Sequence, residues 1–169
     1  GLGSIYEKIL AGEHLSAEDG LKLYETPDIL SVGALANVVR ERKNGNRAYF
    51  NRNQHINYTN ICNKVCKFCA FQRLPGEEGG YVYSPEEIRA KMKATLDYFI
   101  CEVHMVAGIN PKLPYSYYLD ILKAVKSVRP NIHIKAFTMV ELAHIVRLSK
   151  KSVEETLQEL KQAGLGSLP

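Results

Sequence analysis

The sequence lacks the features that would place it in a membrane or in the secretory pathway. No apolar run in the 169 residues approaches the roughly 20 residues that a membrane-spanning helix needs. The N-terminal stretch GLGSIYEKIL has neither the basic start nor the apolar centre of a signal peptide. We therefore expect a cytoplasmic protein with no membrane partner.

Cysteine is also scarce, and its distribution argues against a disulfide framework. The chain has four cysteines, and three of them, Cys62, Cys66 and Cys69, fall in one short stretch. An odd set of clustered thiols is typical of a metal site in a reducing compartment rather than of paired disulfides. This stretch is the first candidate for a functional site.

Clustered positive charge is absent as well. The net charge is +4, and the 22 lysines and arginines are spread along the chain. Nucleic-acid-binding proteins usually concentrate such residues on one face, so we expect no nucleic-acid partner. A mild preference for small anionic ligands is the most that this charge predicts.

The first 46 residues predict a helical leader with three short helices. Ser16 and Asp19 have the spacing of a capping box, and Thr26 followed by Pro27 predicts the start of the third helix. Asn44-Gly45 then predicts its end. No residue of this leader carries an obvious chemistry, so we expect it to pack and not to react.

Residues 47–169 alternate between strand and helix patterns. Strands are expected at 55–59, 100–106 and 132–137, with helices starting at Ser84, Tyr115, Met139 and Ser152, and a further strand starting at Leu165. This alternation predicts an α/β fold with a parallel sheet. A closed (β/α)8 barrel needs about 250 residues, so we expect the first part of a TIM-type barrel, truncated at its C-terminal end. The absence of an initial Met also indicates a fragment.

One face of the three expected strands is polar, which is unusual for a buried parallel sheet. The alternating polar positions are His55, Asn57 and Thr59 on the first strand, Glu102 and His104 on the second, and His133 and Lys135 on the third. The apolar positions between them should face the helices, so the polar set should line the lumen. We interpret this face as a pocket for a charged ligand, against the alternatives of a hydrogen-bonded network or of edge strands wetted by an incomplete barrel.

The three clustered cysteines have the spacing CNKVCKFC, from Cys62 to Cys69. A structural zinc site usually takes four ligands in two separated pairs, and no second pair exists here. Cys101 is expected on the apolar face of its strand, buried as a small hydrophobic residue. Three thiolates fit a [4Fe–4S] cluster with one iron left open, while zinc or a redox thiol remain the lesser alternatives.

The CxxxCxFC spacing after a first barrel strand resembles the radical S-adenosylmethionine (SAM) superfamily. The resemblance implies that Cys62, Cys66 and Cys69 hold the cluster and that its open iron binds the amino and carboxylate groups of SAM. It further implies that Phe68 covers the adenine and that Ala107 and Gly108 contact the SAM amino group. A second glycine is expected where this chain has Ala107. Asn57 is expected in the same cofactor site.

Four longer segments are similar to the aminodeoxyfutalosine synthase family: INYTNICNKVCKFCAFQR, LPYSYYLDILKAVK, HIKAFTMVELAH and QELKQAGLGSLP. The resemblance implies a transferase of menaquinone biosynthesis. Such an enzyme adds the 5′-deoxyadenosyl radical to 3-[(1-carboxyvinyl)oxy]benzoate, with loss of carbon dioxide, and consumes SAM as a co-substrate. It also implies an electron donor such as flavodoxin or ferredoxin. A fragment of this kind is expected to carry the cluster motif without being active alone.

The substrate of that family carries two carboxylates, which suits the polar face of the strands. Lys135, His133 and His104 are the cationic side chains that we expect against them, with His55 as a further candidate. Two related radical SAM enzymes remain as rivals: the dehypoxanthine futalosine cyclase, and the subunit that makes the deazaflavin of coenzyme F420. The AFTMVE segment, residues 136–141, favours the synthase. A zinc- or nucleic-acid-binding module is the alternative outside the enzymes.

Overall fold

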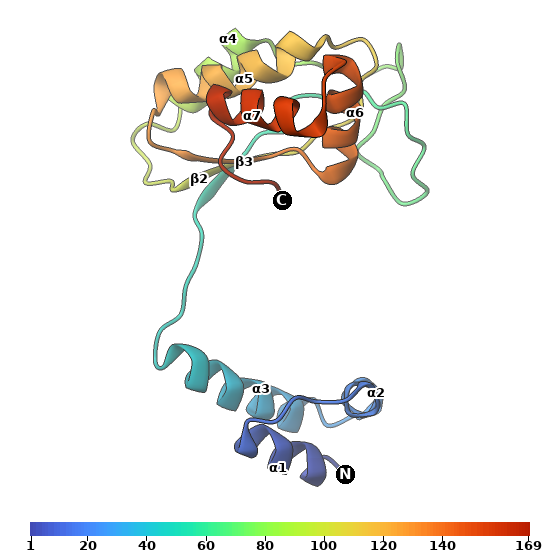
Figure 1. Cartoon of the computed structure of the whole chain (residues 1–169), viewed down its shortest axis with the longest axis vertical. Coiled ribbons are helices and arrows are strands. Elements are labelled where there is room, and N and C mark those ends of the chain that lie inside the picture. The colour runs from blue at the N-terminus through green and yellow to red at the C-terminus, as the bar shows by residue number, and fades with distance from the viewer. The chain divides into compact units, whose positions relative to one another are not determined.

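The computed structural model describes all residues from Gly1 to Pro169 and contains two compact units, Gly1–Phe50 and Asn51–Pro169 (Figure 1). No helix in either unit is both long and apolar enough to span a membrane. The first unit holds helices only. The second unit holds the sheet, the cysteine stretch and the remaining helices.

Three helices form the first unit: α1 (Gly3–Ala11), α2 (Ala17–Glu25) and α3 (Ile29–Asn44). Its small core is built around Ile5, Ile9 and Leu35. The capping box predicted at Ser16 is confirmed, because the backbone N–H of Asp19 donates to the Ser16 hydroxyl.

The predicted start of the third helix was wrong. Asp28 caps α3 in place of Thr26, and Pro27 lies before the helix. The Asp28 carboxylate accepts hydrogen bonds from both the backbone N–H and the hydroxyl of Ser31, at 3.1 and 2.6 Å. A carboxylate satisfies free N–H groups at a helix start at least as well as a threonine hydroxyl, which explains the shift.

The second unit contains a parallel sheet of three strands: β1 (Asn53–His55), β2 (Glu102–Met105) and β3 (His133–Ala136). They lie in the order β1-β2-β3. Four helices accompany them, α4 (Pro85–Lys93), α5 (Tyr115–Val128), α6 (Met139–Ser149) and α7 (Val153–Ala163). In Figure 1 these helices lie on one side of the strands. The predicted α/β fold with parallel strands is confirmed.

The first strand lies earlier than predicted, at 53–55 instead of 55–59. Beyond it, the N–H of Ile56 still donates to the His104 carbonyl, at 2.9 Å. Thr59, however, pairs in antiparallel fashion with Val82, so the chain has left the sheet by that point. At the other edge, Ser167 forms a single parallel bridge with Lys135, where a further strand was expected to start.

The core lies between the sheet and the helices. Val103 and Met105 on β2, and Ile134 and Ala136 on β3, are fully buried. This confirms that the apolar alternation of these strands faces the helices. Tyr58, Tyr118 and Phe137 pack against one another in edge-to-face geometry, with ring centroids 5.8–6.1 Å apart. Aromatic rings prefer this arrangement because the positive edge of one meets the negative face of the next.

The segment between α4 and β2 is exposed, and the burial predicted for Cys101 was wrong. Leu96 and Phe99 are 51% and 73% exposed, because α4 ends at Lys93 and the chain continues as turns. Cys101 is also exposed, since it lies one residue before β2 and outside its alternation. Its thiol lies 2.7 Å from the Asn51 side-chain oxygen.

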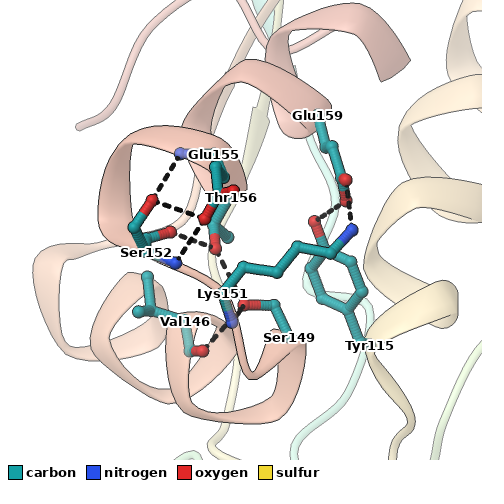
Figure 2. Close-up of polar contacts among 8 residues, drawn as sticks. All are labelled: Tyr115, Val146, Ser149, Lys151, Ser152, Glu155, Thr156 and Glu159. Carbon is teal, nitrogen blue, oxygen red and sulfur yellow. Dashed lines mark hydrogen bonds and ion pairs between the residues drawn. The ribbon is translucent and has the colours of Figure 1, made fainter.

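Polar contacts fix the connection between α6 and α7 (Figure 2). Lys150 ends α6 in a left-handed conformation, with φ of 56°. The Ser149 hydroxyl then accepts from the N–H of Lys151 and lies 2.8 Å from the Thr156 hydroxyl. Glu159 on α7 accepts from the Tyr115 hydroxyl of α5 at 2.8 Å and pairs with Lys151. These contacts link α5, α6 and α7 to one another.

We predict that Asp19 makes the first unit sensitive to acid. The Lys8 ammonium donates to this carboxylate at 2.6 Å and, with hydrogen bonds from Ser16, lowers the pKa of Asp19 from its ordinary value of 3.8 to about 2. A lowered folded-state pKa stabilises the fold above the unfolded pKa, and this stabilisation disappears as the pH falls from about 4 to about 2. Asp19→Asn should therefore lower the melting temperature at pH 7, and its melting curve should converge with the wild type near pH 2.

Thermal melting followed by circular dichroism between pH 7 and pH 2 measures this difference. Glu25→Gln is the matched control, because Glu25 is exposed and lies on the same helix, α2. It should follow the wild type at every pH. A difference between Asp19→Asn and the wild type that stays constant down to pH 2 would contradict the role of the Lys8–Asp19 pair.

Candidate active site

The cysteines lie on a loop that is closed at its base. The N–H of Cys62 donates to the Arg73 carbonyl, and the N–H of Arg73 donates to the Asn60 carbonyl, both at 2.9 Å. Beside them, the N–H of Asn63 donates to the carbonyl of Ile109, which follows β2, at 3.0 Å. The loop is thus anchored to itself and to the carboxyl end of the neighbouring strand. Active sites of α/β barrels form at this end of the strands.

The three thiols of the loop are free but do not converge in the structure. Cys62 is buried, Cys69 is half-buried and Cys66 is exposed. A turn in which the N–H of Cys69 donates to the Cys66 carbonyl, at 3.1 Å, brings these two residues near each other. No three His, Cys, Asp or Glu side chains lie close enough together to hold a metal ion. The residue types fit an iron–sulfur cluster, whose ligands are cysteine thiolates, whereas the side-chain placement is not that of a preformed site.

Gly108 lies directly against the start of the cysteine loop. A Cβ atom at this position would come within 2.4 Å of the Ile61 carbonyl oxygen and 3.0 Å of the Cys62 Cβ. The N–H of Gly108 donates to the Thr59 carbonyl at 3.0 Å, which holds the two segments together. Only glycine allows this close approach of two backbones. The predicted pair Ala107 and Gly108 therefore adjoins the predicted cluster ligand Cys62.

Asn57 and Phe68, the other predicted cofactor residues, have different surroundings. The Asn57 side-chain amide donates to the Val106 carbonyl at 2.7 Å and so links the end of β1 to the end of β2. Phe68 is 94% exposed on the cysteine loop. The structure brings Asn57 close to the Ala107–Gly108 segment and does not attach Phe68 to the core.

One residue expected on the polar face lies elsewhere. Thr59 is fully buried, and its hydroxyl donates to the Tyr81 carbonyl at 2.6 Å and accepts from the N–H of Ile61 at 3.1 Å. The antiparallel pairing with Val82 turns the chain, so the alternation of the strand does not extend to this residue. Thr59 therefore supports the backbone at the start of the loop.

The remaining polar residues form two rows across the sheet. Strand pairing aligns His55, His104 and Lys135 in one row, and Asn53, Glu102 and His133 in the next row toward the amino ends of the strands. The first row is thus nearer to the cysteine loop. The predicted residues Lys135 and His104 share a row, whereas His133 lies in the other row with its Nε2 atom 2.8 Å from the Ser167 hydroxyl.

The imidazole rings of His55 and His104 are stacked, with centroids 5.0 Å apart and planes inclined by 7°. Burial, and then the proximity of His104, lowers the pKa of His55. Two positive charges on stacked rings would repel each other, which is why His104 contributes to this lowering of the His55 pKa. Lys135 takes part in none of the four ion pairs of the chain. The row therefore presents a free ammonium group beside two imidazoles.

Sequence reasoning missed Glu141 and Tyr58. Glu141 is 2% exposed, and its Oε1 atom accepts hydrogen bonds from the Tyr58 hydroxyl at 2.7 Å and from the N–H of Ala107 at 2.9 Å. The available signal was the capping-box spacing of Thr138 and Glu141 directly after the third strand. That spacing predicts a helix start, but it does not indicate that the glutamate is buried.

Comparisons with known proteins agree with the fold and with the motif. The family model of the radical SAM superfamily matches residues 56–168. The aminodeoxyfutalosine synthase of Thermus thermophilus is 42% identical over 165 residues, which are 98% of this chain and 44% of that protein. The cyclic dehypoxanthine futalosine synthase of Halalkalibacterium halodurans is 40% identical over 169 residues, or 99% of this chain and 46% of that protein.

A likeness among solved structures supports the same fold. The crystal structure of HydG, a maturase of the [FeFe]-hydrogenase, matches 96% of this chain and 35% of its own, with a TM-score of 0.71 and 19% identity. The chain spans about half the length of the curated relatives it matches. The family model covers β2, β3, the cysteine loop and the Ala107–Gly108 segment. On this evidence the chain belongs to the radical SAM superfamily, as its cysteine motif predicted.

Proposed function

We propose that this chain is the cluster-binding part of an aminodeoxyfutalosine synthase. The observation that carries the proposal is the 42% identity to such a synthase along 98% of the chain, including the cysteine loop and the AFTMVE segment. The reaction adds the 5′-deoxyadenosyl group of SAM to 3-[(1-carboxyvinyl)oxy]benzoate and yields aminodeoxyfutalosine, methionine and carbon dioxide. This activity belongs to a complete barrel, because the chain spans 44% of that relative.

The cysteine loop supplies the metal ligands of this proposal. Cys62, Cys66 and Cys69 would hold a [4Fe–4S] cluster, since soft thiolates are its usual ligands. When bound, the cluster would supply the electron that cleaves SAM, and a donor such as flavodoxin or ferredoxin would first bring the cluster to the reduced state. Free cysteines and electron donors of this kind are consistent with a cytoplasmic protein.

The residues around the loop would orient SAM. Gly108 allows its segment to approach Cys62 closely, and the Ala107–Gly108 segment would offer backbone groups to the SAM amino group. Asn57 holds the end of β1 against this segment through its bond to Val106. Phe68 is exposed on the loop and would cover the adenine, which excludes water from one side of the cofactor.

The polar face of the sheet would hold the two carboxylates of the substrate. Lys135 would supply an ammonium group, and His104 lies beside it in the same row. His133 lies one row further from the cysteine loop and would bind or orient the more distant carboxylate. Charge-assisted hydrogen bonds of this kind are stronger than bonds between neutral groups, so they would fix the alkene of the substrate near the SAM site.

A second candidate function is that of the futalosine cyclase. A cyclic dehypoxanthine futalosine synthase is 40% identical to the chain, nearly as similar as the aminodeoxyfutalosine synthase. The F420-deazaflavin synthase subunit is a third candidate, and a zinc-binding module fits least, because the sequence has no second cysteine pair beside the three clustered thiols. The three enzymes differ in whether the adenosyl group ends in the product or is released as 5′-deoxyadenosine.

We predict that the three loop cysteines, but not the fourth, are needed for iron binding. Anaerobic reconstitution of the chain with iron and sulfide should give a brown protein with about four irons. Cys62→Ala, Cys66→Ala and Cys69→Ala should each lose most of the iron and the associated absorbance. Cys101→Ala is the matched control and should retain both, because Cys101 is exposed outside the loop. A colourless wild-type protein that binds one zinc ion would contradict the assignment of a [4Fe–4S] cluster to these cysteines.

Product analysis tests the reaction itself. A chimera in which this chain replaces the matching part of the Thermus thermophilus synthase provides a complete barrel. With SAM, the enol-ether substrate and a reductant, we expect aminodeoxyfutalosine without free 5′-deoxyadenosine, because the adenosyl group ends in the product. Stoichiometric release of 5′-deoxyadenosine with a nucleoside or tyrosine substrate would assign the chain to one of the rival enzymes.

We also predict that Lys135 contributes to substrate binding. In the same chimera, Lys135→Ala should reduce kcat/KM for the enol-ether substrate by about tenfold to a hundredfold, since hydrogen bonds to charged groups contribute about 1.5–3 kcal/mol. Lys123→Ala removes an equal charge from the exposed face of α5 and should have no effect. Unchanged turnover and substrate affinity in Lys135→Ala would show that the polar face does not bind the substrate.

A further inference from the structure

Glu141 is the only buried acidic side chain of the unit Asn51–Pro169. Its two oxygens accept four hydrogen bonds from two sets of partners. Oε2 accepts from the N–H and the hydroxyl of Thr138, at 2.8 and 2.7 Å. Oε1 accepts from the Tyr58 hydroxyl at 2.7 Å and from the N–H of Ala107 at 2.9 Å.

The other capping boxes of this unit show what a cap alone requires. Glu87 and Glu155 make the same contacts to Ser84 and Ser152 that Oε2 of Glu141 makes to Thr138. Both of these glutamates are exposed, and neither bonds to another strand or helix. The contacts of Oε1 are therefore additional to capping.

These additional contacts join three segments at the carboxyl edge of the sheet. Tyr58 follows β1, Ala107 follows β2, and Glu141 lies in the first turn of α6, which follows β3. Ala107 immediately precedes Gly108, whose backbone touches the start of the cysteine loop at Ile61. A single carboxylate thus connects the segment that adjoins the cysteine loop to residues that follow β1 and β3.

The backbone before Glu141 is strained in a way that supports this placement. Phe137 has φ of 68°, a left-handed conformation that is unfavourable for a bulky residue. Its ring is fully buried, with centroids 6.0 Å from that of Tyr58 and 5.8 Å from that of Tyr118. Such strain persists where surrounding packing imposes it, and it is concentrated at functional sites. Helix α6 begins directly after Phe137, with Thr138 as its cap, and Glu141 in its first turn accepts the hydrogen bond from the Tyr58 hydroxyl.

Burial makes this carboxylate costly. Desolvation raises the pKa of Glu141 against the lowering effect of its hydrogen bonds, and no lysine or arginine pairs with it. A well-packed apolar side chain often stabilises a fold more than a buried charge does. The contact with Ala107 is therefore better explained by a need for exact placement of this segment than by stability.

We propose that Glu141 is a positioning residue of the SAM site, which fixes the Ala107–Gly108 backbone against the cysteine loop through Tyr58 and the N–H of Ala107. This inference rests on the proposed function, because it requires SAM to bind at that segment. It assigns to Glu141 no contact with the cofactor. Its effect should therefore appear in SAM affinity and not in cluster assembly.

The test uses the chimera, reconstituted with iron and sulfide, and SAM as the titrated ligand. Glu141→Gln keeps the shape of the side chain, but an NH2 group replaces one carboxylate oxygen. This NH2 group then faces the two donors that bonded to that oxygen. Tyr58→Phe removes one donor and leaves the cap intact. We expect Glu141→Gln to bind SAM about tenfold more weakly, and Tyr58→Phe to show a smaller loss, with the iron content of the wild type in both. The change that SAM causes in the electron paramagnetic resonance spectrum of the reduced cluster reports binding.

Two controls separate positioning from stability. Glu155→Gln alters an equivalent capping box on α7, and Ile145→Val trims a fully buried side chain on α6. Both should bind SAM as the wild type does. In the iron-free chain, the amide of Ala107 should exchange its hydrogen faster in Glu141→Gln than in either control, which tests the hydrogen bond without any cofactor.

The possible outcomes distinguish this inference from the proposed function. Wild-type SAM affinity in both Glu141→Gln and Tyr58→Phe would show that Glu141 is only a helix cap and would overturn the inference. A loss of affinity in Ile145→Val equal to that in Glu141→Gln would overturn it as well. If Glu141→Gln does not fold, Tyr58→Phe decides alone. A wild-type chimera that takes up neither iron nor SAM would instead overturn the proposed function.

Discussion

The close approach of Gly108 to Ile61 is the contact on which the site depends. It places the backbone at the end of β2 directly on the first residues of the cysteine loop, where a Cβ atom would come within 2.4 Å of the Ile61 carbonyl oxygen. Hydrogen bonds from Gly108 to Thr59 and from Asn63 to Ile109 surround this contact. The position of the loop is therefore set by contacts between residues that follow β1 and residues that follow β2. A loop held in this way keeps its thiols at the carboxyl edge of the sheet, even where the side chains themselves do not converge.

The local features of the fold were readable from the sequence because their causes are local. The capping boxes at Ser16, Ser84 and Ser152 depend on side chains three residues apart, and α5 begins at Tyr115, as its local pattern predicted. The strand alternation was also readable, because side chains of a strand alternate between two faces. The cysteine spacing was sufficient to predict the superfamily, since the ligands of one cluster lie in one loop.

What the sequence did not reveal depends on contacts between distant residues. Thr59 continues the alternation of the first strand, yet its pairing with Val82 removes it from the polar face. Cys101 reads as part of β2, but the strand starts one residue later and leaves it exposed. Glu141 reads as an ordinary cap, and only the hydroxyl of Tyr58, 83 positions earlier, shows that the carboxylate is buried. No pattern of neighbouring residues contains this information.

The two faces of the sheet carry different kinds of side chain. The apolar face packs against α4–α7 and forms the core of the unit. The opposite face presents Lys135, His104 and His55 in one row, and these polar groups are of little use to a packed core. Glu141 connects the helices to the candidate site. It lies in the first turn of α6, and its Oε1 atom accepts hydrogen bonds from Tyr58 and Ala107, which follow β1 and β2. The same packing that stabilises the fold therefore also places the segments that, on the proposed function, would bind cluster, cofactor and substrate.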